Sequence, residues 1–277
     1  MRVLLLGYGD IASRVARRLT AQAGVEVVGI CRNPEHKSAP QGVTLQAADI
    51  SNEQDLKPLL QNQHWDVAVV TLTPAEYSDE GYRQGYVVPM RHLQMALHQH
   101  PNIQRLLYIS STSVYQHQAG EWVDENTPTQ PQKATAKRLL EAERLVASFA
   151  AETAILRCSG IYGPGRTYAL KRSQQTDLSV TDAWTNRIHS EDVAKVIVAL
   201  LHRQQALPDT LLVTDNQPSR QANVYRWLAQ QQGVDCANWT EQTAQELGKR
   251  CSNQRLRELG IVLDFPSYRE GYSALLR

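Results

Sequence analysis

The sequence predicts an α/β fold in which helices cover both faces of a doubly wound parallel sheet, followed by a small C-terminal lobe. Short, nearly continuous runs of Val, Leu and Ile alternate with amphipathic stretches through the first half of the chain. A glycine-rich turn follows the first of these runs, and the alternation stops after Gly160. Buried runs separated by helices are typical of parallel sheets built with right-handed crossovers.

The expected elements follow in chain order. The first helix has apolar Ile11, Val15, Ala16 and Leu19 at helical spacing, and Ser190 with Glu191 and Asp192 is a typical helix start. We predict strands over residues 2–6, 25–30, 43–47, 67–72, 105–109, 154–158 and 210–214. We predict helices over residues 11–21, 53–60, 86–98, 134–151 and 191–202. Beyond residue 214 we expect helices and polar loops.

These elements divide the chain between a sheet domain and a lobe. We expect the sheet domain to span residues 1–165, completed by 187–215. The lobe would then consist of 166–186 and 216–277, where a Gly-Pro-Gly turn at 163–165 leads into a polar, irregular stretch. No repeat or long linker separates the two parts.

Composition narrows the function class. The 277 residues are 42% hydrophobic and 21% charged with a net charge of +1, and Lys and Arg are scattered, so nucleic acid is not an expected partner. The apolar run from Val3 to Leu6 is far too short to span a membrane. Four widely spaced cysteines, with no ligand spacing toward histidines, indicate free thiols, a cytoplasmic location and no metal site.

The glycine-rich turn indicates a Rossmann-like dinucleotide site. Gly7 permits a tight turn after the strand, Gly9 lets a pyrophosphate approach the backbone, and Ala12 is the small residue that packs helix on strand. Backbone N–H groups at the helix start, around Asp10 and Ile11, favour phosphate binding. The acid of Asp10 would repel phosphates, and helix capping is its alternative role.

The end of the second strand favours NADP over NAD. NAD sites usually carry Asp or Glu there, whereas this chain has Cys31-Arg32-Asn33, and the Arg32 guanidinium suits a 2′-phosphate. A solvent-exposed loop Arg32 is the alternative. Asp49 ends the third strand, where its carboxylate could accept from the adenine amino group. Thr71, in the strand expected over 67–72, completes the candidate cofactor contacts.

Four ordered segments resemble the extended short-chain dehydrogenase/reductase family, in its NAD(P)-dependent epimerase/dehydratase branch. They are Ser110-Ser111-Thr112-Ser113-Val114-Tyr115, Glu125-Asn126-Thr127-Pro128, Leu156-Arg157-Cys158-Ser159-Gly160-Ile161-Tyr162-Gly163-Pro164-Gly165 and Ile188-His189-Ser190-Glu191-Asp192-Val193-Ala194. The resemblance covers about residues 1–215. The tail resembles that of an atypical subgroup with a reduced substrate lobe.

The family's catalytic tyrosine is missing from the matching position. In the family, a Tyr acts as acid and base, and the Lys four residues later lowers the pKa of this Tyr and binds the nicotinamide ribose. An upstream Ser or Thr polarises the substrate oxygen. The resemblance places Ser111 at the hydroxyl position and Lys137, followed by Glu141, at the lysine, which leaves Lys133 in place of the Tyr.

Four interpretations stay open. Lys133 could be the base, since the positive charge of Lys137 and of NADP favours its neutral form. Tyr115 or Tyr162 could supply the phenol. The proton transfer could be lost, or the helix could be out of register with the motif. Against these roles stands the alternative that Lys133 and Lys137 are simply exposed lysines on a helix face.

The resemblance also suggests substrate contacts. The candidates are Ser111, Thr112, Ser159, Asn186 and Arg187. His189 is expected to make a supporting hydrogen bond, and Asp192 to stabilise a helix N-terminus. Sugar-nucleotide members carry an Arg where this chain has Thr185, and the 166–184 segment is short, so we expect a smaller substrate.

The resulting hypothesis is an NADP-binding oxidoreductase or isomerase that acts on a small carbonyl or hydroxyl compound. The alternative is a catalytically degenerate protein that senses NADP and signals to a partner. Many relatives pair through two long helices, so a homodimer is possible.

Overall fold

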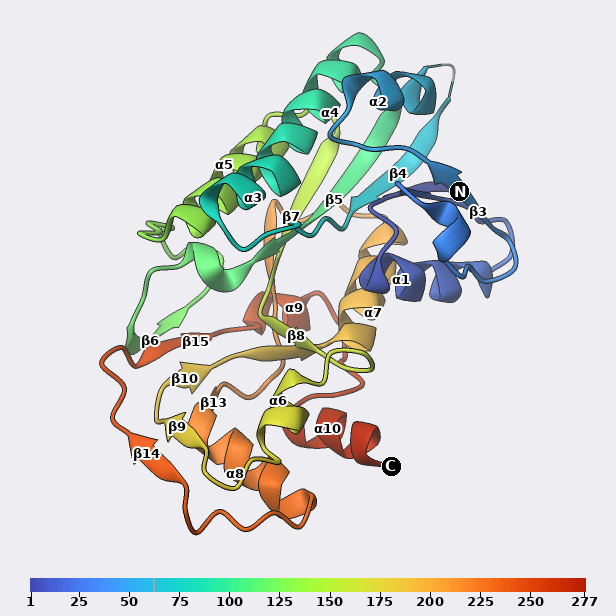
Figure 1. Ribbon diagram of the computed structural model, residues 1–277. Coiled ribbons are helices and arrows are strands. Elements are labelled where there is room, and N and C mark those ends of the chain that lie inside the picture. Colours follow the sequence, from blue (N-terminus) through green and yellow to red (C-terminus); the bar gives the residue numbers. More distant parts are fainter. Residues whose placement is uncertain (62) are drawn as a thin grey trace. The chain divides into compact units, whose positions relative to one another are not determined.

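The computed structural model describes residues 1–61 and 63–277, which form two compact units (Figure 1). Unit 1 comprises Met1–Val114, Thr129–Arg157 and Ala194–Leu211. Unit 2 comprises Tyr115–Pro128, Cys158–Val193 and Leu212–Arg277.

A seven-stranded sheet has the order β12-β7-β5-β4-β1-β2-β3, and all of it except the ends of β7 and β12 belongs to unit 1. Its strands are β1 (Arg2–Leu6), β2 (Glu26–Cys31), β3 (Val43–Ala47), β4 (Trp65–Val70), β5 (Ile103–Ser111), β7 (Glu152–Cys158) and β12 (Thr210–Val213). β1 pairs in parallel with both β2 and β4, so the strand order reverses beside β1. Ligands of doubly wound sheets bind at the carboxyl ends of the strands at such a reversal. The predicted fold class is confirmed.

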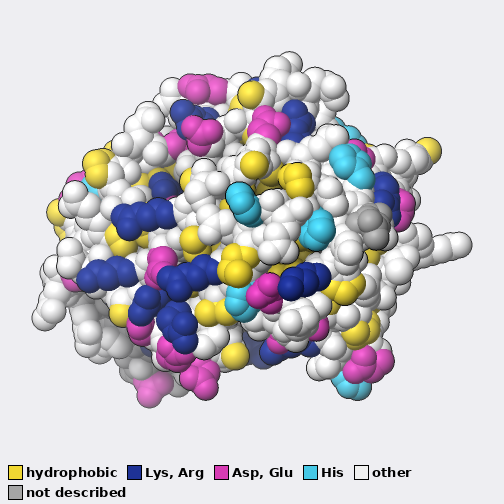
Figure 2. All heavy atoms as spheres, turned by 90° about the horizontal axis from the view of Figure 1, so that it is seen from above, with side chains coloured by type: hydrophobic (Ala, Val, Ile, Leu, Met, Phe, Trp, Pro, Cys, Tyr) yellow, Lys and Arg dark blue, Asp and Glu magenta, His cyan; other side chains and the backbone are white. Residues whose placement is uncertain are grey.

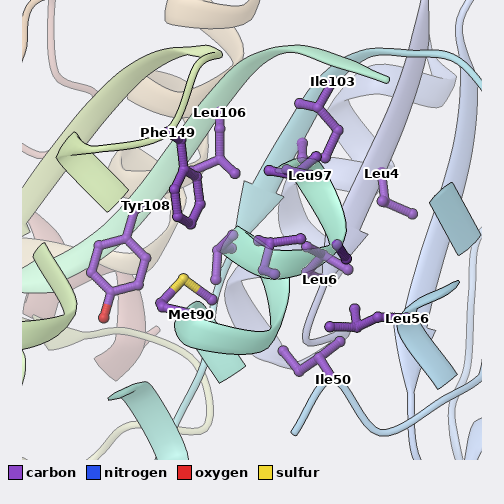
Figure 3. Close-up of a cluster of buried hydrophobic side chains, with 14 of the residues drawn as sticks. Leu4, Leu6, Ile50, Leu56, Met90, Leu97, Ile103, Leu106, Tyr108 and Phe149 are labelled. Atoms are coloured by element: carbon purple, nitrogen blue, oxygen red, sulfur yellow. The ribbon is translucent and has the colours of Figure 1, made fainter. Parts of the chain in front are cut away.

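Helices complete unit 1 and bury its main core. They are α1 (Asp10–Thr20), α2 (Glu53–Leu60), α3 (Asp79–Tyr82), α4 (Val88–Gln99), α5 (Ala134–Ala147) and α7 (Ser190–Leu201), with short turns η1 (Pro34–His36), η2 (Arg83–Val87) and η3 (Thr112–Val114). The first four residues of α7 belong to unit 2. Figure 3 shows part of this core, where Leu4 and Leu6 lie among side chains that include Met90 and Leu106. These side chains are almost completely removed from water, which is the main favourable contribution to folding.

Two predicted helices have different ends in the structure. The helix predicted over 86–98 begins at Asp79, because Ser78 Oγ caps it by accepting from Gly81 N at 3.0 Å. Its π-helical turn η2 precedes Pro89, which has no N–H for a regular helical bond. The helix predicted over 134–151 ends at Ala147, where Ser148 N donates to Leu145 O at 3.1 Å.

Unit 2 contains short paired strands and four helices. The strands are β6 (Ala119–Val123), β8 (Gly160–Tyr162), β9 (Ser179–Thr181), β10 (Trp184–Thr185), β11 (Arg187–His189), β13 (Ser219–Arg220), β14 (Thr240–Gln242) and β15 (Gly248–Cys251). The helices are α6 (Tyr168–Arg172), α8 (Gln221–Gln231), α9 (Gln254–Glu258) and α10 (Tyr268–Leu276). The expectation of only helices and loops after residue 214 is therefore wrong. Strands of two to four residues are too short to show an alternating pattern.

In the described part of the chain, no helix is long and apolar enough to cross a membrane, and no disulfide joins the four cysteines. On the face drawn in Figure 2, basic and acidic side chains are intermingled.

Candidate functional site

The glycine-rich turn joins β1 to α1 at the strand reversal in unit 1. Gly7 has φ +90°, and a Cβ atom there would lie 2.8 Å from Thr71 O, so only glycine fits without strain. Gly9 is the N-cap of α1, and a Cβ atom at Gly9 would meet nothing within 4 Å. The backbone at the helix start therefore faces open space.

The other predicted residues of the turn lie at the start of α1. Ile11 and Ala12 are buried, so they pack the helix on unit 1. Asp10 is the first residue of the helix, and its Oδ1 accepts from Arg14 Nε at 2.8 Å. The guanidinium of Arg14 therefore offsets the negative charge that would otherwise oppose a phosphate.

A cavity of about 620 Å³ opens beside this turn and is formed by unit 1 alone. It is lined by the predicted cofactor residues Gly7, Gly9, Arg32, Asp49 and Thr71. Among the residues that the structure describes, four other predicted cofactor residues do not line the cavity: Asp10, Ile11, Ala12 and Lys137. The structure thus brings five separately predicted residues, from the ends of four strands, to one hollow.

The end of β2 contributes the cations of the cavity. Arg32 and Lys37 both line it and are both exposed. Within residues 1–61 and 63–277 neither side chain has an ion-pair partner. Lys37 was not predicted from the sequence, although its position five residues after Arg32, past the short η1 turn, is a signal that could have identified it.

Asp49 and Thr71 are held in place by local hydrogen bonds. Asp49 Oδ1 accepts from Ser51 N at 2.9 Å and from Ser51 Oγ at 2.6 Å. Thr71 Oγ1 donates to Gly7 O at 2.6 Å, and Thr71 N donates to Leu6 O at 2.9 Å. Thr71 therefore fixes the glycine turn against the end of β4. The remaining carboxylates of the lining are Glu76 and Glu80, and Glu80 pairs with Arg83 at 2.7 Å.

The carboxyl end of β5 carries Ser111 and Thr112. Ser111 Oγ accepts from Ser113 N at 3.1 Å, and Thr112 is buried in η3, which packs against α5. Beneath them, Ser110 Oγ donates to Glu143 Oε1 at 2.5 Å, and Arg157 donates to Glu143 Oε2 at 2.7 Å. This buried network of β5, α5 and β7 was not anticipated from the sequence.

The two lysines of the predicted motif lie on the outer side of α5. Lys133 is the N-cap residue, its carbonyl accepts from Lys137 N at 3.0 Å, and both side chains are exposed. Glu141 is also at the surface, where it pairs with Arg91 and Arg138. In the described chain neither lysine lines the cavity.

The two predicted tyrosines belong to unit 2. Both are buried, and Tyr115 O accepts from Lys249 Nζ at 3.1 Å. Tyr162 OH donates to Ser267 O at 3.3 Å, and its ring packs on His189 and Tyr272. Burial, together with the nearby Asp215, raises the pKa of the Tyr162 phenol. The phenolate form of Tyr162 is therefore disfavoured.

Three predicted substrate contacts also lie in unit 2. Ser159 Oγ is buried and has no hydrogen-bond partner among the described residues. Asn186 bridges Lys249 O at 2.9 Å and Cys251 N at 2.8 Å, which is a structural role. The half-buried Arg187 donates to Thr185 Oγ1 at 2.8 Å.

His189 and Asp192 support the backbone of unit 2. His189 Nδ1 accepts from Glu191 N at 3.2 Å, as the expected supporting bond requires. Asp192 lies in the first turn of α7, but its carboxylate accepts from Asp264 N at 2.7 Å and Phe265 N at 2.9 Å. It holds the segment before α10 in addition to its place at a helix start.

Comparisons with known proteins agree with this geometry. Residues 7–204 match a family described as NAD(P)H-binding. No curated protein matches the chain. A Methylobacillus flagellatus structure described as an NAD-dependent epimerase/dehydratase is similar, with 36% identity and a TM-score of 0.84 over 99% of this chain and 97% of that one.

Two more distant structures share the fold. UDP-glucuronic acid 4-epimerase from Bacillus cereus, in complex with NAD, is 20% identical, with a TM-score of 0.83 over 99% of this chain and 97% of that one. dTDP-glucose 4,6-dehydratase from Bacillus anthracis, also in complex with NAD, is 15% identical, with a TM-score of 0.81 over 100% and 95%.

Proposed function

The chain belongs to the NAD(P)H-binding family, and on that premise we propose that it binds NADP in the cavity of unit 1 as a protein of the epimerase/dehydratase type. The cavity carries this proposal, because it joins the open glycine turn to two cations that lack an acidic partner in the described chain.

The pyrophosphate would lie against Gly9 at the start of α1. Free backbone N–H groups and the helix dipole favour anions there. The open space beside Gly9 admits the phosphates, and the pairing of Asp10 with Arg14 reduces their repulsion. The site thus offers the main elements of a dinucleotide cradle.

The 2′-phosphate would lie against Arg32, with Lys37 nearby. A guanidinium can bind a phosphate through two charge-assisted hydrogen bonds. An NAD site instead usually has a carboxylate at the end of this strand, which accepts from the ribose hydroxyls. Asp49, on the next strand, would accept from the adenine amino group with its second oxygen.

For the reaction, we propose hydride transfer at the nicotinamide beside Ser111, with a small carbonyl or hydroxyl compound as substrate. The family's Ser or Thr polarises the substrate oxygen, and Ser111 stands at the matching end of β5. A small carbonyl or hydroxyl compound remains our choice over the sugar nucleotides of the more distant neighbours. We expect the protein to act in the cytoplasm.

A second candidate is favoured by the side chains available for proton transfer. Both lysines of α5 are exposed, and the Tyr162 phenol is buried with a raised pKa. A protein that binds NADP and signals its level to a partner needs neither group. We therefore keep the sensing function as the alternative.

Titration with NADPH and NADH tests the cofactor assignment. The wild-type protein should prefer NADPH, and Arg32→Glu should weaken NADPH binding by about 10- to 100-fold, the range expected for one lost charge-assisted interaction. Arg144→Glu, the same charge change on the exposed side of α5, is the matched control and should bind as the wild type does. Unchanged selectivity in Arg32→Glu would refute the role of Arg32.

Turnover separates the two candidates. NADPH oxidation would be measured against small aldehydes, ketones and deoxysugars. Activity lowered by Ser111→Ala supports the enzyme, whereas tight NADPH binding with no turnover across the panel supports the sensor.

A further inference from the structure

Helix α5 separates its side chains into a buried and an exposed face. The buried residues are Ala136, Leu139, Leu140, Ala142, Glu143 and Val146. Lys133, Lys137 and Arg144 are exposed. The directions of successive side chains around a helix differ by roughly 100°, so the Lys137 and Leu139 side chains lie about 160° apart around the helix axis. The lysine therefore extends from the side of the helix that faces solvent.

The buried network fixes the position of α5 along the sheet. Glu143 contacts Ser110, the last but one residue of β5, and Arg157 of β7. In a crossover between parallel strands the helix runs opposite to the strands, so its N-terminus lies at their carboxyl edge. Residues of α5 that precede Glu143 therefore lie progressively nearer to the ligand edge.

Thr135, the second residue of α5, is half-buried, and helical geometry places it next to the buried face at the ligand end of the helix. It lies two turns before Glu143, roughly 12 Å along the axis and about 80° around it. Leu139 lies between them, only about 40° from Thr135. Thr135, Leu139 and Glu143 thus form a stripe with a spacing of four, and η3, which follows Ser111, packs against the same helix.

We propose that Thr135, and not Lys133 or Lys137, is the α5 side chain that meets the ligand beside the nicotinamide, where its hydroxyl and that of Ser111 bind a polar oxygen. The inference rests on the proposed binding of NADP in unit 1. In this alignment Thr135 stands at the position of the family's Tyr, and Leu139 stands at the position of its Lys. The alignment is shifted by two residues from the one based on Lys137 and Glu141.

This register changes what the site can do. A threonine hydroxyl donates and accepts hydrogen bonds but does not ionise near neutral pH, so Thr135 orients a ligand and does not supply a proton on its own. Leu139 is 3% exposed and apolar, and it cannot bind the nicotinamide ribose as a lysine would. Hydroxyl-mediated binding without an α5 cation is therefore the property that distinguishes this site.

Cysteine protection by NADP tests the proposal. Thr135→Cys and Lys137→Cys would be alkylated with iodoacetamide, with and without NADP, and each thiol followed by mass spectrometry. Native Cys31 lines the cavity and is the internal reporter of cofactor binding. Burial raises the pKa of the Cys31 thiol, so a mildly alkaline buffer is used.

The expected result is protection of Cys31 and of the thiol at 135 only. With NADP at about 100 times its dissociation constant, about 1% of the protein is unoccupied. A covered thiol should therefore react at least about tenfold more slowly than without NADP. The thiol at 137 should keep its rate within about twofold, because it stays in solvent at any occupancy.

The other outcomes are distinct. Protection of Cys31 and of the thiol at 137, but not at 135, overturns the proposed register while the cofactor site stands. No protection of Cys31, together with no binding in the titration, contradicts the cofactor site itself.

Discussion

Replacing Gly9 by valine should remove cofactor binding and leave the fold almost intact. Gly9 has φ −107°, which any residue adopts, and a Cβ atom there meets nothing within 4 Å. The new side chain would fill the space that we assign to the pyrophosphate. The substitution thus separates the binding role of this position from its structural role.

The two effects differ in size. An apolar residue at a helix N-cap costs about 1 kcal/mol or less relative to glycine. Loss of about two charge-assisted hydrogen bonds from the backbone to phosphate costs about 3–6 kcal/mol, which is a loss of affinity of more than about 100-fold. Gly7→Ala should instead lower the stability of the fold. A φ of +90° costs about 1–2 kcal/mol for alanine, and the new Cβ would lie 2.8 Å from Thr71 O.

Calorimetric titration with NADPH and unfolding in urea measure these two quantities on the same preparations. Gly9→Val should unfold near the wild-type midpoint and bind NADPH too weakly to measure. Gly7→Ala should unfold at a lower urea concentration. Wild-type NADPH affinity in a folded Gly9→Val protein would refute the placement of the pyrophosphate.

Two further predictions concern buried charges. Arg157→Met leaves Glu143 buried without its ion-pair partner and should lower the free energy of unfolding by about 3–5 kcal/mol. Adding Glu143→Leu should restore much of this loss. Equal stability of the single variant and the wild type in urea unfolding would contradict the prediction. Burial raises the pKa of Asp215 to about 7, above its unfolded value of about 4. The folded state therefore binds more protons between these values, and stability should fall as pH rises from about 4 to 7. Asp215→Asn should flatten this dependence and be more stable than the wild type at pH 8; a less stable variant at that pH would count against the argument.

The sequence determines the sheet and the cofactor turn because both are encoded locally. The apolar runs predict the strands of the sheet, with ends that differ by a few residues at most. Gly7 and Gly9 follow one strand directly and open one helix, so their spacing is sufficient to predict a turn. Arg32 and Asp49 were predicted in the same way, since parallel strands end at one edge, and both line the same cavity.

Only the tertiary structure decides which face of α5 is buried against the sheet. Lys137–Glu141 and Leu139–Glu143 have the same spacing, and a helical period alone does not choose between them. The choice comes from Ser110 and Arg157, which lie on strands 33 and 14 residues away from Glu143 along the chain. The burial of Tyr162 is decided likewise by the distant Ser267 and Tyr272. Such contacts depend on how separate elements pack, and local spacing does not contain that information.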